Sequence, residues 1–185
     1  MDFALLRDAF WGLTFDGIAL GAIYALISLG YTLVYGVLRL INFAHSEVFM
    51  IGTFAALVTA SGIMGVNVED EPRTGVSMIF TLLICLVIAM LASAITAVLV
   101  EIIAYRRLRQ RGATKLATLI SAIGVSISLV ELFRIITDSL PREFPRIMEK
   151  TFLFSYAGAD IRNDKVIVII AAGSVSYTHL RAHET

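Results

Sequence analysis

Long stretches without any charged residue dominate this chain. Residues 17–38, 48–68 and 74–100 contain no Asp, Glu, Lys or Arg, and they are 22, 21 and 27 residues long. A helix of about 20 apolar residues is long enough to cross the hydrocarbon core of a bilayer. A fourth stretch, 115–133, is interrupted only by Glu131. The sequence therefore predicts an all-α membrane protein, a polytopic transmembrane helix bundle with about four complete spans.

The overall composition agrees with a membrane protein. Apolar residues make up 58% of the chain and charged residues 16%, against about 45–50% and 25% in soluble domains. This balance argues against a soluble enzyme. The formal net charge is +0, so no overall field indicates binding to nucleic acid. The single cysteine, Cys85, lies inside an apolar run and is expected to serve packing.

The charges between the spans indicate how the helices are oriented. The loop 101–115 carries five basic residues and one acid, whereas the turn 69–73 carries three acids and one arginine. By the positive-inside rule the loop is cytoplasmic and the turn lies outside. Alternation along the chain then places the N-terminus and residues 134–165 outside, and the turn 39–47 inside.

The ends of the chain differ in character from the bundle at 17–133. Residues 1–16 are predicted to form an interfacial segment, because apolar side chains recur there at helical spacing. Residues 134–165 are predicted to form an extracytoplasmic loop, either a docking surface or a solvated connector. Residues 166–173 are expected to begin a truncated fifth helix. Residues 174–185 lack that pattern and resemble a non-native tail, so we expect the chain to be a fragment.

Each predicted span has a face of small residues. Helices in lipid associate through such faces, because no hydrophobic drive acts between apolar helices in an apolar solvent. We therefore expect the four spans to pack as one bundle. The small residues are Gly17 and Gly21 in the first span, Gly52, Ala56 and Ala60 in the second, Cys85, Ala89, Ser93 and Ala97 in the third, and Ala117, Ser121, Gly124 and Ser128 in the fourth.

Three tyrosines and one acid are candidate transport-path residues. Tyr24, Tyr31 and Tyr35 fall within a narrow arc of the first span, where phenols either line a path for a solute or serve helix packing. Glu131 is the one acid inside a span, and an ionisable group there is a functional candidate. Its position near the outer end of the helix also allows the carboxylate to reach water. Both interpretations stay open.

The nine-residue turn 39–47 joins the first two spans. We predict that Ser46 and Glu47 cap the start of the second span, since an acid suits the positive end of a helix. Asn42 and His45 supply donors and acceptors for the backbone of so tight a reversal. The turn is then either a purely structural element or part of a polar transport site, because transporters build such sites at helix ends.

Two blocks of sequence carry a family resemblance. Residues 31–52, YTLVYGVLRLINFAHSEVFMIG, resemble the signature of the LivH-type permease subunit of branched-chain amino-acid ABC importers. EIIAYRRLR from position 101 and KLATLISAIG from position 115 resemble the family's cytoplasmic arginine turn and the helix after it. The resemblance covers most of residues 11–133. The family usually has glycine, proline and an amide where this chain has Ser46, Arg107 and Glu131.

The resemblance implies a multi-pass permease of the bacterial inner membrane that moves leucine, isoleucine or valine by alternating access. Its implied partners are a second permease subunit, two cytoplasmic ATPase subunits, a periplasmic amino-acid-binding protein and membrane lipid, with no nucleic acid. The chain has no GxxxxGK[ST] phosphate loop, so ATP is expected to be bound by the partners and no catalytic or cofactor-binding residue is assigned here. The family's ATPase-coupling segment lies downstream of these residues.

Other functions have less support. An intramembrane protease needs a Ser and His pair or two acids inside the spans, which contain neither His nor Asp. His179, His183 and Glu184 have a spacing that could hold a metal, but they fall in the expected tail, and no metal site is predicted. A non-transporting membrane scaffold or a self-associating four-helix channel remains the alternative, and neighbouring genes for two ATPases and a binding protein would argue against it.

The predicted orientation can be tested by cysteine labelling in intact cells. We expect Gly112→Cys to resist an impermeant thiol reagent, because residue 112 lies in the basic loop predicted to be cytoplasmic. We expect Asp138→Cys to react, because residue 138 lies in the segment predicted to be outside. The reverse pattern would refute the topology.

Overall fold

The computed structural model describes residues 3–38, 42–156 and 159–184. Their elements are α1 (Phe3–Leu38), α2 (His45–Val58), η1 (Thr59–Ile63), α3 (Gly75–Val100), η2 (Glu101–Arg106), α4 (Arg107–Gln110), α5 (Lys115–Ile136), β1 (Phe152–Tyr156), β2 (Ala159–Arg162) and α6 (Asn163–Glu184), where η denotes a π-helix. The chain divides into a central unit, Val34–Glu149, and a terminal unit, Met1–Leu33 with Lys150–Thr185. The predicted all-α fold class is confirmed, apart from one small hairpin.

Within the described residues, four helical stretches are long and apolar enough to cross a membrane. They are Ala9–Gly36, His45–Ile63, Gly75–Gln110 and Lys115–Ile136. These stretches coincide with the four spans predicted from the distribution of charge. Large apolar side chains such as Val76 remain exposed on them, as expected for surfaces that contact lipid or further helices rather than water.

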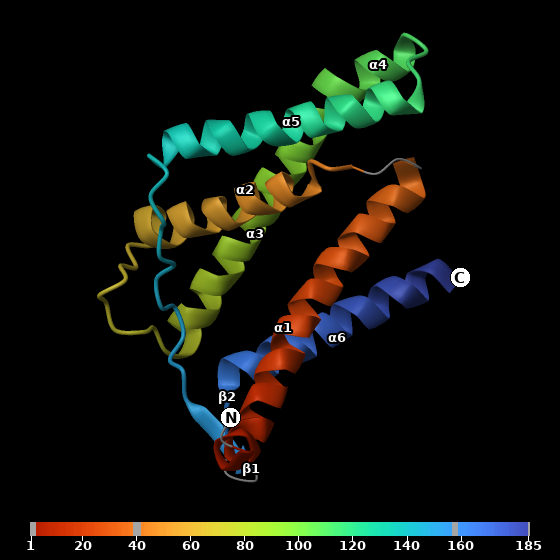
Figure 1. The fold of residues 1–185 in the computed structure, drawn as a ribbon. Coiled ribbons are helices and arrows are strands. Elements are labelled where there is room, and N and C mark those ends of the chain that lie inside the picture. The colour runs from red at the N-terminus through yellow and green to blue at the C-terminus, as the bar shows by residue number, and fades with distance from the viewer. Residues whose placement is uncertain (1–2, 39–41, 157–158, 185) are drawn as a thin grey trace. The chain divides into compact units, whose positions relative to one another are not determined.

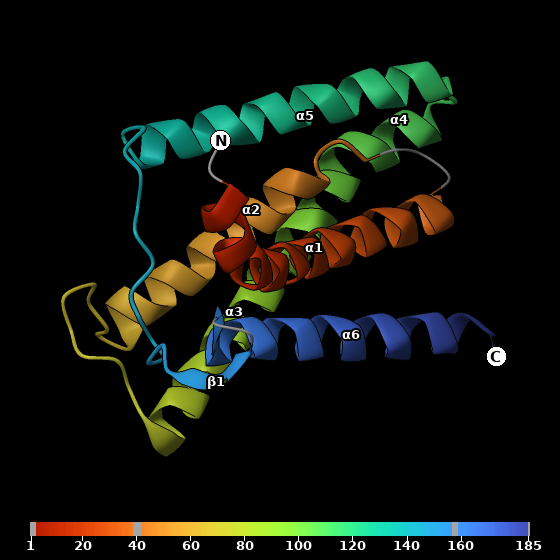
Figure 2. The same ribbon diagram turned by 60° about the horizontal axis from the view of Figure 1, so that its bottom comes forward.

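The central unit is built from α2, α3 and α5, with α3 crossing α2 (Figures 1 and 2). Two buried clusters hold the three helices. One joins Ala44 before α2 to residues of α3, η2 and α5, and the other joins η1 and α3 to Ile147. The first cluster lies at the C-terminal end of α3, at Val100, and the second lies nearer its middle, at Cys85.

α2 and α3 approach each other closely at Gly52 of α2. A Cβ atom at this position would lie 2.3 Å from Ser93 Oγ and 3.4 Å from the Ala89 carbonyl oxygen of α3. Ser93 Oγ also donates a hydrogen bond across the contact to the Val48 carbonyl, at 3.2 Å. The predicted small faces of the second and third spans therefore pack against each other, and a side chain at residue 52 would require Ser93 Oγ or the helices to move.

Two π-helical segments continue the spans. η1 follows α2 directly, and η2 follows α3 directly and leads into α4. A π-helix changes the hydrogen-bonding step of the backbone and so redirects the side chains after it. In η2 this places Tyr105 in the buried cluster with Ala44. On its exposed side Glu101 forms ion pairs with Arg106 and Arg109, with N–O distances of 3.2 and 2.8 Å.

Arg73 organises the end of the central unit that the charge pattern assigns to the outside. Its Nη1 donates to Thr81 Oγ1 at 2.9 Å, and its Nη2 donates to the Met64 carbonyl. Its backbone N–H donates to the Ile147 carbonyl at 3.1 Å. Ile147 packs into the buried cluster of η1 and α3. Arg73 therefore joins three segments that are far apart in sequence, a role that its charge alone did not predict.

The terminal unit contains most of α1, the hairpin of β1 and β2, and α6. The strands pair antiparallel, with Phe154 opposite Ile161, and their register is irregular between Phe152 and Phe154. Lys165 of α6 donates a charged hydrogen bond to Asp16 of α1. The hairpin lies in the segment 134–165, for which the sequence predicted only a loop.

Some predicted boundaries fall inside observed helices. α1 continues without a break past residue 16, and α6 runs from Asn163 past residue 174 to Glu184. The interfacial position of residues 1–16, the outside location of 134–165, the truncated helix at 166–173 and the non-native tail at 174–185 all stay predictions. Residues 39–41 of the predicted turn lie outside the described residues, as do the side chains of His183 and Glu184.

We predict that Gly52→Ala destabilises the protein by about 1–3 kcal/mol, the usual cost of overpacking a tight contact. The new methyl group would collide with Ser93 Oγ, so the helices must separate or Ser93 must rotate and lose its bond to Val48. Unfolding of the purified protein in mixed micelles, followed by circular dichroism, measures the change.

Two matched variants accompany this test. Gly124→Ala adds the same methyl group to α5, where nothing lies within 4 Å of the new atom, and should not destabilise the protein, since alanine is the better helix former. Gly52→Ala combined with Ser93→Ala should recover most of the loss, because the Ser93 Cβ is 3.7 Å from the new atom. Equal stability of Gly52→Ala and Gly124→Ala would contradict the tight contact.

Candidate functional site

Asn42 is the organising residue of the turn before α2. Its Oδ1 accepts a hydrogen bond from the Ala44 backbone N–H at 3.0 Å, so the prediction that Asn42 satisfies the backbone of the turn is confirmed. The same oxygen accepts a hydrogen bond from the Tyr105 hydroxyl at 2.6 Å. Asn42 thereby ties the start of α2 to η2 through Tyr105, which lies 63 residues after Asn42 in the chain.

Glu47 lies in the first turn of α2 and is 8% exposed. Its predicted place at the positive end of the helix is confirmed, and Ser46 Oγ donates to Glu47 Oε2 at 3.0 Å. The prediction that Ser46 caps the helix is wrong. The N-cap residue is Ala44 and makes no side-chain cap bond, because α2 already begins at His45 and Ser46 falls inside the first turn.

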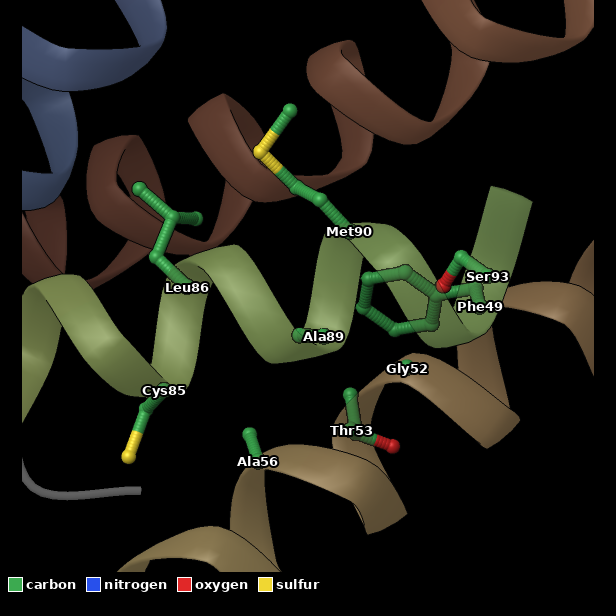
Figure 3. Close-up of a pocket in the computed structure, with 9 residues that line it drawn as sticks. All are labelled: Phe49, Gly52, Thr53, Ala56, Cys85, Leu86, Ala89, Met90 and Ser93. Carbon is green, nitrogen blue, oxygen red and sulfur yellow. The ribbon is translucent and has the colours of Figure 1, made fainter. Parts of the chain in front are cut away.

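A groove of about 530 Å³ runs along the contact between α2 and α3 (Figure 3). In Figure 3, Gly52 faces Ala89 and Ser93, while Leu86 and Met90 extend from α3 away from α2. The hydroxyls of Thr53 and Ser93 both donate to backbone carbonyls of α2. The groove therefore offers an apolar surface without a charged group.

A second cleft of about 670 Å³ lies between α2, the end of α3 with η2, and α5. The small residues Ser121, Gly124 and Ser128 of α5 line it, opposite Thr96 and Val100 of α3. Ser128 and Thr96 donate to carbonyls of their own helices, each at 2.8 Å. Three residues of the predicted small face of the fourth span thus border a cleft whose opposite wall comes from the third span.

The amino-acid sequence matches a known family of membrane proteins over most of its length. The profile of the branched-chain amino acid transport system permease component matches residues 13–182. The chain belongs to this family. The family resemblance drawn from residues 31–52 is confirmed, and the family consists of transmembrane permease components that are not themselves ATPases.

Two curated relatives of this chain are permease proteins of high-affinity branched-chain amino acid transport systems. BraD, the high-affinity branched-chain amino acid transport system permease protein of Pseudomonas aeruginosa, is 31% identical over 88% of this chain and 51% of its own length. LivH, the corresponding permease protein of Escherichia coli K12, is 39% identical over 62% of this chain and 34% of its own. The chain thus spans about half the length of BraD and about a third of the length of LivH. No solved structure gives a significant match.

The structure places three of the seven predicted site residues of this permease at the start of α2. Asn42, His45 and Glu47 share the turn and the first turn of α2. Tyr24 and Tyr35 are largely exposed, whereas Tyr31 is half-buried. Glu131 lies near the C-terminal end of α5. Its Oε1 forms an ion pair with Arg134 Nη1 at 2.9 Å, and 53% of the Glu131 side chain is exposed. Transport roles for all seven stay proposals.

Tyr105 is the site residue that sequence reasoning missed. It lies in the arginine block from residue 101, but no spacing rule connects it to Asn42. One signal was available: the positive-inside rule places the turn 39–47 and the loop 101–115 at the same membrane face. The rule thus brings polar groups of both segments to one end of the bundle, where a tyrosine is a candidate partner.

We predict that Tyr105→Phe lowers the free energy of unfolding by about 1 kcal/mol, the net worth of one hydrogen bond. The variant keeps the ring in the buried cluster and removes only the hydroxyl that donates to Asn42. Denaturant titration of the purified protein in micelles measures the change. Tyr35→Phe, at an exposed ring, serves as the control, and equal effects of both substitutions would contradict an ordered Asn42–Tyr105 bond.

Proposed function

We propose that this chain acts in a permease subunit of an ABC importer that moves branched-chain amino acids across the bacterial inner membrane. The observation that carries the proposal is the family match over residues 13–182. The four helices long enough to span a membrane support it. The substrate class follows from the relatives, which are described as branched-chain amino acid transport proteins.

The mechanism that we propose is alternating access, in which one helix bundle moves against another around a central site. Such a movement needs helices that keep their mutual packing while they shift. The Gly52 contact, the Asn42–Tyr105 hydrogen bond and the Arg73 bonds each connect segments of the central unit. We therefore assign α2, α3 and their turns to one rigid body.

Within this mechanism the predicted site residues take two kinds of role. Asn42, His45 and Glu47 are proposed to position the cytoplasmic end of the rigid body, since Asn42 joins two of its segments directly. Tyr24, Tyr31, Tyr35 and Glu131 are proposed to face the transport path or a neighbouring helix.

The proposed partners are those of an ABC importer. They are a second permease subunit, two cytoplasmic ATPase subunits that bind and hydrolyse ATP, and a periplasmic binding protein that delivers the amino acid. The apolar groove beside Gly52 is a surface on which another transmembrane helix could pack, and membrane lipid would cover the remaining apolar surface.

We predict that deletion of the gene encoding this chain abolishes binding-protein-dependent uptake of labelled leucine in a strain that lacks other leucine importers. The intact gene supplied on a plasmid should restore uptake, because the permease forms the path through the membrane. Uptake of an unrelated solute such as proline serves as the control. Unchanged leucine uptake in the deletion strain would contradict the proposed function.

A further inference from the structure

A third cleft, of about 370 Å³, opens at the end of the central unit where Arg73 joins the loops. This volume falls within the range of about 300–1,000 Å³ that is typical of small-molecule sites. Its walls come from the ends of α2 and α5, from η1, and from the segments 66–68 and 142–145. The charge pattern assigns both of these segments to the outside of the membrane, so the cleft would face the compartment from which a solute enters.

The cleft combines an apolar wall with two opposite charges. Phe54, Leu57, Val66 and Ile136 are among the apolar residues that line it. Arg142 and Glu143 line the same cleft and are exposed. In the part of the chain that the structure describes, neither of these two side chains forms an ion pair or a hydrogen bond. Their charges are therefore available to a ligand.

The other two clefts lack this combination. The groove beside Gly52 and the cleft between α3 and α5 are lined by apolar residues and by hydroxyls, with no charged side chain. A zwitterion placed there would lose its hydration without gaining a charged partner, which is costly in an apolar site.

The end of α5 at the third cleft favours a cation beside the apolar wall. α5 ends at Ile136, which lines the cleft. The C-terminal end of a helix carries a partial negative charge, which attracts an ammonium group. Glu143 adds a full negative charge, while the Arg142 guanidinium can hold a carboxylate through two parallel hydrogen bonds.

We propose that this cleft is an entry site for a zwitterionic amino acid with an aliphatic side chain. Arg142 binds the α-carboxylate, Glu143 and the end of α5 bind the α-ammonium, and the side chain lies against Phe54, Leu57 and Val66. The inference rests on the proposed function for its substrate class, but it adds a specific outer site that the amino acid occupies before it enters the membrane.

Protection of a cysteine tests occupancy of the cleft independently of transport. Cysteine is introduced at one of two neighbouring positions, Val68→Cys or Glu69→Cys. Val68 lines the cleft, whereas Glu69, the next residue of the same loop, does not. Each substitution is introduced into the full importer in membrane vesicles with the outer face exposed, and alkylation by an impermeant maleimide is timed with and without leucine. The unsubstituted chain, whose Cys85 is buried, gives the background.

We expect leucine to slow alkylation at residue 68 and not at residue 69. 3-Methylbutylamine, which lacks the carboxylate, and 4-methylpentanoate, which lacks the ammonium group, should protect poorly. Arg142→Gln or Glu143→Gln should raise the leucine concentration for half-protection by about three- to fivefold, the effect of losing one exposed charge pair. Arg146→Gln, an exposed arginine of the same segment outside the cleft, should leave it unchanged.

Three outcomes would overturn the entry site. Leucine could fail to protect residue 68 in vesicles that take up leucine, it could protect both positions equally, or only the loaded binding protein could protect. The last outcome would make the cleft a protein-docking surface. Absence of leucine uptake in the unsubstituted importer would instead count against the proposed function, so the two failures are distinguishable.

Discussion

The close approach of α2 and α3 at Gly52 is the contact on which the central unit depends. In lipid, apolar side chains gain little by leaving one apolar surrounding for another, so helices stay together through close packing and a few hydrogen bonds. Gly52 supplies the space, and the Ser93 hydroxyl fills it while bonding to the Val48 carbonyl. A larger residue at position 52 would separate the helices that support the turns at both ends.

Polar bonds then fix the two ends of this helix pair. At one end Asn42 accepts bonds from Ala44 and Tyr105, and at the other Arg73 joins Thr81 and the Ile147 carbonyl. The segments joined at each end are those that the positive-inside rule assigns to the same side of the membrane. The charge pattern and the packing therefore agree. The outer end also carries the cleft lined by Arg142 and Glu143.

The sequence predicts the spans and their packing faces better than it predicts the polar contacts. Absence of charge locates four spans because an unpaired charge in lipid is costly, and small residues locate the face that contains Gly52. The Asn42–Tyr105 bond depends on the π-helical turn of η2, which redirects Tyr105 and has no compositional signal. The Ser46 cap was wrong because helix start signals locate a helix end only to within a few residues. The hairpin of β1 and β2 was missed because its strands are short and lie in a segment of mixed charge.

Disulfide trapping tests the central contact most directly. The Cβ positions of residues 52 and 93 are 3.7 Å apart, close to the mean of about 3.8 Å in disulfides. In membranes that carry Gly52→Cys with Ser93→Cys, oxidation should protect both thiols from a large maleimide until a reductant is added, whereas each single variant should stay reactive after denaturation. Full modification of both thiols after oxidation would contradict the account, because α2 and α3 would then not meet at Gly52.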